Sequence, residues 1–240
     1  MTRPNICFRQ DDIDLATNNG SVNSIELPIH CFDVIIARLN KRPLPKCPPS
    51  IPNECFPLFV TLYKGNFRHL RGCIGTFNRN LPLHEGLNEY AQISAFRDTR
   101  FDPVTLHEVP LLQCRVSLLV CFEPADDYRD WVVGLHGIRI EFRQHHRPLN
   151  AVFLPEVAFD NGWDHVETVN HLMWKGGFKG DITETDRLSV LVERFQSDRS
   201  SVTYEEYMAY KQKQLEEDSE FGDGGGQSNG IVNGFMHSNP

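Results

Sequence analysis

The segment that most constrains the fold is LFVTLYKGNFRHLRGCIGTF, residues 58–77. Apolar and β-branched residues lie on both sides of Gly65-Asn66, a dipeptide suited to a tight turn. The pattern therefore predicts a β-hairpin, in which consecutive strands pair antiparallel. Further strands are predicted at 114–122, 137–142, 149–155 and 188–195, the middle two forming a second hairpin.

Helical periodicity separates these strands. Helices are predicted at 24–39, from about 82 to the polar segment at 97–103, at 163–178 and at 203–217. Asp164 is a suitable N-cap, and Thr203 with Glu206 forms a capping-box pattern. Because hairpins and helices are mixed without strict strand–helix alternation, we expect an α+β or mixed α/β fold in which β-hairpins pack with helices.

Composition divides the chain into three parts. Residues 1–23 are polar and predict a loose leader, and 214–240 are rich in Gly, Ser and Asn and predict a disordered tail. Residues 24–213 contain the periodic segments and predict one folded domain. A proline-rich stretch at 42–57 is expected to be an extended connector within it.

Charge and cysteine content limit the function classes. The formal net charge is −8, which argues against a general nucleic-acid binder because phosphate binding needs a basic face. The seven cysteines are an odd number without a Cys-x-x-Cys pair, and the chain opens without a signal-peptide pattern. No apolar run approaches the roughly 20 residues of a membrane helix. We therefore expect a soluble protein with reduced thiols in the nucleus, the cytoplasm or both, and no membrane partner.

Strand alternation gives the stretch LRGCIGT, residues 70–76, two faces. Leu70, Gly72 and Ile74 are expected to point toward the core. Arg71 and Cys73 are expected to share the other face. The arginine could then lower the pKa of the cysteine and favour a nucleophilic thiolate.

Two functional interpretations of this stretch remain open. In the first, Cys73 is a nucleophile, Arg71 its electrostatic activator, and the amides around Gly72 and Gly75 donate to an anion. In the second, the glycines are a packing device and the cysteine is inert. His69 lies roughly 13 Å along the strand from Cys73, too far to act as its base.

Three further residues are candidate ligand-binding groups. Arg97 and Asp98 lie with Arg100 where a helix is predicted to end, and could form a salt-bridged corner or line a polar pocket with Arg71. Glu156 follows a predicted strand, a weaker indication of a site. No residue spacing predicts a metal site, and none identifies a cofactor.

An ordered set of short motifs resembles a known family. The motifs are CFDVI (31–35), PLFVT (57–61), LRGCIGTF (70–77), SAFRDTRF (94–101), VSLL (116–119), DW (130–131), HGIRIEF (136–142), LPEVA (154–158), GWDH (162–165) and KGGFK (175–179). In this order they are similar to the AMMECR protein family, named for the Alport syndrome, midface hypoplasia and elliptocytosis chromosomal region, and look like its animal branch.

The resemblance implies a compact fold of two subdomains with a cleft near LRGCIG. It marks Arg71, Gly72, Cys73 and Gly75 as signature positions, and implies that the position of Glu156 also accepts an amide. No settled reaction comes with the family, although prokaryotic relatives are associated with Memo-type and radical-SAM proteins. Animal members are associated with the nucleus.

These observations favour an interaction, scaffold or regulatory protein with an unidentified protein partner and a small-molecule-sized cleft near LRGCIGT. The alternative is a thiol-dependent enzyme or ligand-handling protein that uses Cys73 activated by Arg71. Whether the chain is an enzyme stays open at this point.

Overall fold

The computed structural model describes residues 24–222. The expected leader at 1–23 and the tail from 223 onward lie outside the described residues. The helices are α1 (Glu26–Leu39), α2 (Leu83–Phe96), the 3-10 helix η2 (Leu106–Leu111), α3 (Pro155–Asn161), α4 (His165–Lys175), α5 (Glu184–Leu188) and α6 (Tyr204–Gly222). The strands are β1 (Leu58–Lys64), β2 (His69–Thr76), β3 (Leu112–Pro124), β4 (Gly137–Gln144), β5 (Arg147–Phe153) and β6 (Leu191–Thr203).

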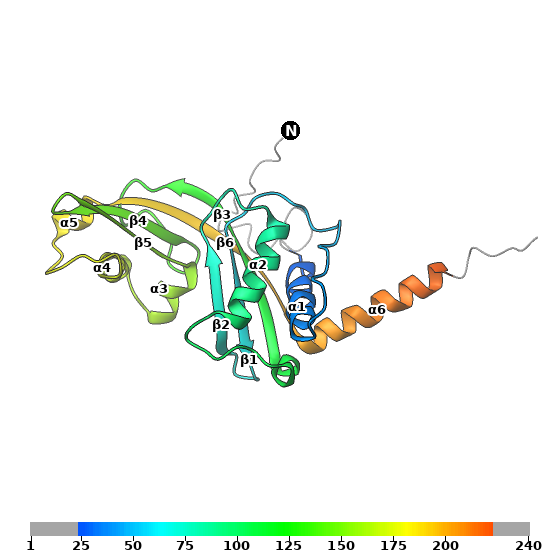
Figure 1. The fold of residues 1–240 in the computed structure, drawn as a ribbon. Helices are drawn as coiled ribbons and strands as arrows, with labels where there is room; N and C mark the ends of the chain where they lie inside the picture. Colours follow the sequence, from blue (N-terminus) through cyan, green and yellow to red (C-terminus); the bar gives the residue numbers. More distant parts are fainter. Residues whose placement is uncertain (1–23, 223–240) are drawn as a thin grey trace, which may run out of the picture.

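One antiparallel sheet of six strands runs through the described molecule in the order β2-β1-β3-β6-β4-β5 (Figure 1). The two predicted hairpins, β1-β2 and β4-β5, form its opposite ends. The 13-residue strands β3 and β6 pair with each other and join the two ends. The predicted α+β class, with hairpins packed against helices, is confirmed.

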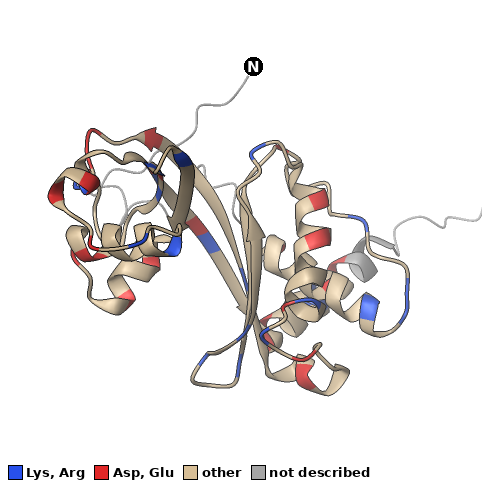
Figure 2. Cartoon of the chain, turned by 60° about the vertical axis from the view of Figure 1, so that its left-hand side comes forward, with Lys and Arg blue, Asp and Glu red and all other residues tan. Residues whose placement is uncertain are grey.

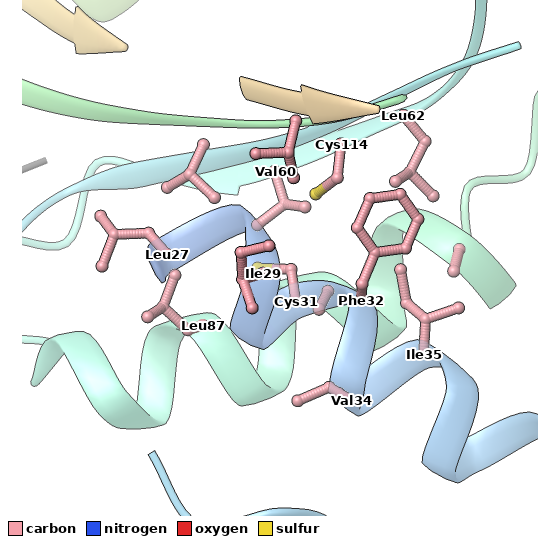
Figure 3. Close-up of a cluster of buried hydrophobic side chains, with 14 of the residues drawn as sticks. Leu27, Ile29, Cys31, Phe32, Val34, Ile35, Val60, Leu62, Leu87 and Cys114 are labelled. Atoms are coloured by element: carbon pink, nitrogen blue, oxygen red, sulfur yellow. The ribbon is translucent and has the colours of Figure 1, made fainter. Parts of the chain in front are cut away.

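The first hydrophobic core lies between β1-β2-β3 and the helices α1 and α2, which cover one face of these strands (Figures 1 and 2). Alternation explains which face the helices cover, since the alternate residues Leu58, Val60 and Leu62 of β1 are fully buried there. Figure 3 shows this packing, with side chains of α1 and α2 meeting those of the strands: Leu27, Cys31, Phe32, Ile35, Leu87, Val60, Leu62 and Cys114.

A second core lies at the other end of the sheet, where α3 and α4 contribute to its packing against β4 and β5. Its fully or almost fully buried members include Tyr128, Ile138, Ile140, Val169, Leu172 and Met173. The molecule therefore has two cores on one continuous sheet. Figure 2 shows the helices α1 and α2 on one side of the long strands, and the helices and strands that carry the second core beyond their other side.

Several predicted element ends are confirmed by local hydrogen bonds. Asp164 caps α4 by accepting from the backbone of Glu167 at 2.8 Å, and Thr203 accepts from the backbone of Glu206 at 3.2 Å. Helix α6 continues to Gly222, past its predicted end at 217 and past residue 214, where the tail was expected to begin. Within residues 24–222, no helix is both long and apolar enough to cross a membrane.

Candidate functional site

The motif strand β2 contains a bulge that alternation did not predict. In the pairing with β1, Tyr63 faces Leu70 and Leu62 faces Gly72, so Arg71 is an extra residue. The bulge moves Leu70 to the face opposite Gly72, and 41% of Leu70 is exposed. The expectation that Leu70 shares the core face with Gly72 was therefore wrong.

The two glycines of the motif lie where a side chain has no room. A Cβ atom on Gly72 would overlap the backbone carbonyl of Ser94 in α2, and one on Gly75 would overlap the Leu58 carbonyl and the Phe59 ring. Both positions have negative φ, so close packing and not an unusual backbone conformation requires glycine. The backbone amides around these two glycines were expected to donate to an anion. They lie in this closely packed part of the hairpin.

The segment SAFRDTRF holds the backbone of β2 in place. Asp98 accepts a hydrogen bond from the Cys73 amide at 2.9 Å, and Arg100 donates to the Cys73 carbonyl at 3.0 Å. Arg100 and Asp98 also form an ion pair at 2.7 Å, with only 3% of the Asp98 side chain exposed. This pair holds the pKa of Asp98 well below its usual range. The salt-bridged corner expected here is thus formed by Asp98 with Arg100, whereas Arg97 is the exposed C-cap residue of α2.

Arg71 is engaged by a carboxylate and not by the thiol. Its guanidinium donates to both Glu108 oxygens, at 3.0 and 3.2 Å, and Lys64 contacts the same carboxylate at 2.8 Å. The hydrogen bonds from Arg71 hold the pKa of Glu108 well below its usual range. A polar pocket of about 620 Å³ adjoins this pair, lined by Arg71, Thr99, Arg100, Phe101, Asp102, Pro103, Thr105 and Glu108.

Cys73 faces away from α1 and α2, beside Thr61, whose hydroxyl donates to Sγ at 3.3 Å. Burial raises the pKa of the Cys73 thiol, while the Thr61 hydrogen bond and the charge of Arg100 oppose that rise. We expected Arg71 to lower this pKa. The structure differs, because the bulge and Glu108 direct the Arg71 guanidinium elsewhere.

Glu156 belongs to α3, a helix of the second core, and its charge acts on Cys73. It lies in the first turn of α3, and its negative charge contributes to raising the pKa of both Cys73 and Tyr63. Its Oε2 atom is buried without a hydrogen-bond partner, and the nearest cation is Arg199 at 3.9 Å. A buried carboxylate oxygen without a hydrogen-bond donor is unusual in a folded protein, and the ion pair with Arg199 is the contact that offsets its charge.

Two arginines that sequence reasoning missed complete this group. Arg115 lies next to Thr61 across the β1–β3 pair and donates to the Tyr63 hydroxyl at 3.1 Å. Arg199 lies on β6 opposite Ser117. Alternation in CRVSLL places Arg115 on the face opposite Val116, and this is the signal that could have found it. We call Tyr63, Cys73, Arg115, Glu156 and Arg199 the open-face cluster.

The cluster mixes a thiol, a phenol, a carboxylate and two guanidiniums. Such groups can bind an anion through the arginines and a hydrogen-bond donor through the glutamate. Among the described residues, no group of three or more His, Cys, Asp or Glu side chains could hold a metal ion.

Comparison with known proteins gives consistent matches. The AMMECR1 family model matches residues 29–200. An uncharacterized protein of Arabidopsis thaliana is 42% identical over 190 residues, covering 77% of this chain and 87% of the relative. An uncharacterized protein of Schizosaccharomyces pombe is 40% identical over 182 residues, covering 75% of this chain and 92% of the relative.

A solved structure is also similar. The crystal structure of an uncharacterized protein of Pyrococcus horikoshii aligns with a TM-score of 0.62 and 27% sequence identity, covering 75% of this chain and 91% of that one.

Proposed function

The chain belongs to the AMMECR1 family, and we propose that it is a non-catalytic interaction protein that binds a partner through the open-face cluster. In this proposal Cys73 is a contact residue in its neutral thiol form. The proposal that it occurs in the nucleus or cytoplasm, and the placement among animal members, stay predictions.

The observation that carries the proposal is the surroundings of Cys73, whose thiol accepts from Thr61 while the Arg71 guanidinium is paired with Glu108. The thiolate is the nucleophile in cysteine chemistry, and reactive cysteines sit in surroundings that lower the thiol pKa. Burial has the opposite effect here, and Glu156 and Asp98 add to it. A thiol in this environment is protonated at neutral pH, which suits contact with a partner better than nucleophilic attack.

Thiol alkylation tests this proposal. The folded protein is treated with iodoacetamide between pH 6 and 10, and labelling of each cysteine is followed by peptide mapping. Exposed Cys55 serves as the internal control. We expect Cys73 to be labelled more slowly than Cys55 at pH 7 and to accelerate above pH 9. Faster labelling of Cys73 than of Cys55 at pH 7 would refute the neutral-thiol proposal.

Two arginine variants show which guanidinium acts on the thiol. Arg100 lowers the pKa of Cys73, so Arg100→Gln should raise it and slow labelling at pH 8. Arg71→Gln should leave that rate unchanged, since Arg71 is paired with Glu108. If Arg71→Gln slows the labelling of Cys73 and Arg100→Gln does not, Arg71 is the activator of the thiol.

The second candidate function is thiol-dependent chemistry, favoured by a Glu156 oxygen near Cys73 that accepts no hydrogen bond. In this candidate Glu156 would accept the thiol proton. The substitution Glu156→Gln separates the two functions, because they predict opposite changes in the labelling rate of Cys73. If Glu156 is only a repelling charge, its removal lowers the pKa of Cys73 and speeds labelling. If Glu156 is a base, the same substitution slows labelling and leaves Cys73 unreactive.

A further inference from the structure

The long strand β6 has a neighbour on both sides along only part of its length. It pairs with β4 from Leu191 to Phe195, whereas its pairing with β3 continues to Thr203. Figure 1 shows β6 running on past β4 and β5 toward α6. Among residues 24–222, no second strand lies beside residues 197–201, which we call the free edge.

The backbone groups of the free edge alternate in direction. The Val192 carbonyl accepts from the Ala125 amide at 2.9 Å, on the side of β3, so even-numbered residues of β6 direct their backbone groups toward β3. The odd-numbered residues Ser197, Arg199 and Ser201 therefore direct their N–H and C=O groups away from β3. Within the described part of the chain, these backbone groups have no hydrogen-bond partner.

The end strands of the sheet differ, because side chains bond to their outer edges. On β2 the Cys73 amide donates to Asp98 at 2.9 Å, and on β5 the Val152 carbonyl accepts from Lys175 at 2.9 Å. A row of unpaired N–H and C=O groups is a template for another strand, and partner proteins use such edges to add one. The free edge of β6 is the part of this sheet that offers such a row.

We infer that the free edge binds an extended segment of a partner protein as an added antiparallel strand, with an aspartate or glutamate opposite Arg199. The inference rests on the proposed function and specifies what the partner presents. Arg199 suits this carboxylate because its side chain is 40% exposed, and 3.9 Å separates it from Glu156, beyond hydrogen-bond distance. Opposite charges directly across paired strands stabilise the pairing.

The charges of the free edge disfavour a second copy of this chain as its occupant. Antiparallel pairing of two copies over the whole free edge places Arg199 opposite its own copy, and like charges directly opposite are destabilising. A register centred on Asp198 places two carboxylates opposite each other in the same way. A register centred on Ser200 avoids both pairs, but it shortens the paired stretch to residues 199–201. A partner segment with a carboxylate at the matching position avoids all three problems.

Hydrogen exchange of the ¹⁵N-labelled full chain tests whether the edge is open. The amides of Ser197, Arg199 and Ser201 should exchange at least about tenfold faster than those of Asp198 and Ser200, which pair with β3. Protection of all five at every protein concentration would show that the chain covers its own edge. Protection that rises with concentration would show that a second copy does. Either result would overturn the inference.

An NMR titration with N-acetyl-Thr-Val-Glu-Val-Thr-amide tests the added strand. In the expected register the N–H of its glutamate points toward β6, and the N–H of the next valine points away. N-methylation at the glutamate should weaken binding at least about tenfold, because it removes a hydrogen bond between the strands. N-methylation at that valine should leave the affinity within about twofold. Equal effects of the two methyl groups would show that the peptide does not bind as a strand.

Side-chain variants test the carboxylate. Arg199→Gln should weaken binding of the glutamate peptide about two- to fivefold. It should leave unchanged the affinity for a peptide with glutamine in the middle. Arg129→Gln is the control, because Arg129 pairs with Glu184 and lies on a different element from the free edge. Its affinity for the glutamate peptide should equal that of the parent protein.

A backbone variant tests the edge itself. Ser197→Pro removes an N–H that points away from β3, and proline is tolerated at such positions of an edge strand. The variant should keep the amide signals of β1 and β4, which shows that it is folded. It should bind the glutamate peptide at least about fivefold more weakly than the parent protein.

Unchanged affinity in both Ser197→Pro and Arg199→Gln would overturn the inference. Slow labelling of Cys73 together with that result would leave an interaction protein with another kind of partner. Fast labelling of Cys73 together with binding that depends on the position of the methyl group would instead refute the neutral-thiol function and keep the added strand.

Discussion

Gly72 allows α2 to pack against the motif strand, because the space that a side chain would fill is taken by the Ser94 carbonyl. We predict that Gly72→Ala costs about 1–3 kcal/mol of unfolding free energy, since backbone must move to relieve the overlap. Urea unfolding measures the loss. The control is Gly65→Asn in the β1–β2 turn, where nothing lies near and asparagine tolerates the positive φ of 74°. A Gly72→Ala protein as stable as the Gly65→Asn control would contradict the packing role.

Asp98 accepts a hydrogen bond from the Cys73 amide of β2 and makes the stability of the protein depend on pH. Its folded-state pKa is depressed by Arg100 and by the backbone amides, so its stabilising contribution is complete above the unfolded-state pKa of about 3.9. That contribution is lost as the pH falls toward the folded-state pKa. We predict that Asp98→Asn is less stable than the parent by about 1.5–3 kcal/mol at pH 7. The gap should narrow by about 1 kcal/mol at pH 3.

Urea unfolding at both pH values measures this gap. Glu205→Gln, at an exposed position in α6, is the control and should leave the stability nearly unchanged at each pH. A gap between Asp98→Asn and the parent that stays constant from pH 7 to pH 3 would show that Asp98 acts without its charge.

At the scale of an element, the capping box at the start of α6 makes a measurable contribution to the free energy of unfolding. The Thr203 backbone donates to Glu206 at 2.7 Å, and α6 docks on α1 through Tyr207, which donates to Asp33 at 2.7 Å. We predict that Thr203→Ala costs about 1 kcal/mol in chemical denaturation. Thr183→Ala removes the same type of cap from α5 but should cost less, because α5 has no buried residue. If Thr203→Ala and Thr183→Ala lose the same unfolding free energy, the docking of α6 on α1 does not increase the contribution of its cap.

The features that could be predicted from the sequence are those that a few neighbouring residues specify. The turn at Gly65 and the caps at Asp164 and Thr203 depend on a few neighbouring residues, and all are present in the structure. The bulge at Arg71 was missed because nothing in the local pattern interrupts alternation. It appears only when β2 pairs with β1.

The same distinction applies to the candidate site. Cys73 stood out because two glycines surround it, and Glu156 because it follows a strand. Arg115 and Arg199 are 84 positions apart and come together through the pairing of β3 with β6, which no local pattern reveals. Even with the right cysteine identified, its environment depended on tertiary contacts. The guanidinium that lowers its pKa comes from Arg100 in the loop after α2, and not from Arg71 in the same strand.

At the scale of the whole molecule, β6 belongs to both cores. It pairs with β3 from Gln113–Thr203 to Pro124–Glu193, and with β4 from Gly137–Phe195 to Glu141–Leu191. Losing either core therefore removes a partner from the same strand. We expect the two ends to unfold as one cooperative unit, because both depend on the same strand.

Two truncations of buried leucines test this coupling. Leu87→Ala in the first core and Leu172→Ala in the second each remove a fully buried side chain, so each should cost about 2–5 kcal/mol. Native-state hydrogen exchange should then show that amides of β1 and of β4 lose protection by the same free energy in either variant. If Leu172→Ala lowers protection in β4 and β5 but leaves β1 and β2 unchanged, the cores are separate cooperative units. The open-face cluster would then span two units, because α3 carries Glu156 and β2 carries Cys73, and partial opening of the second core would disrupt it.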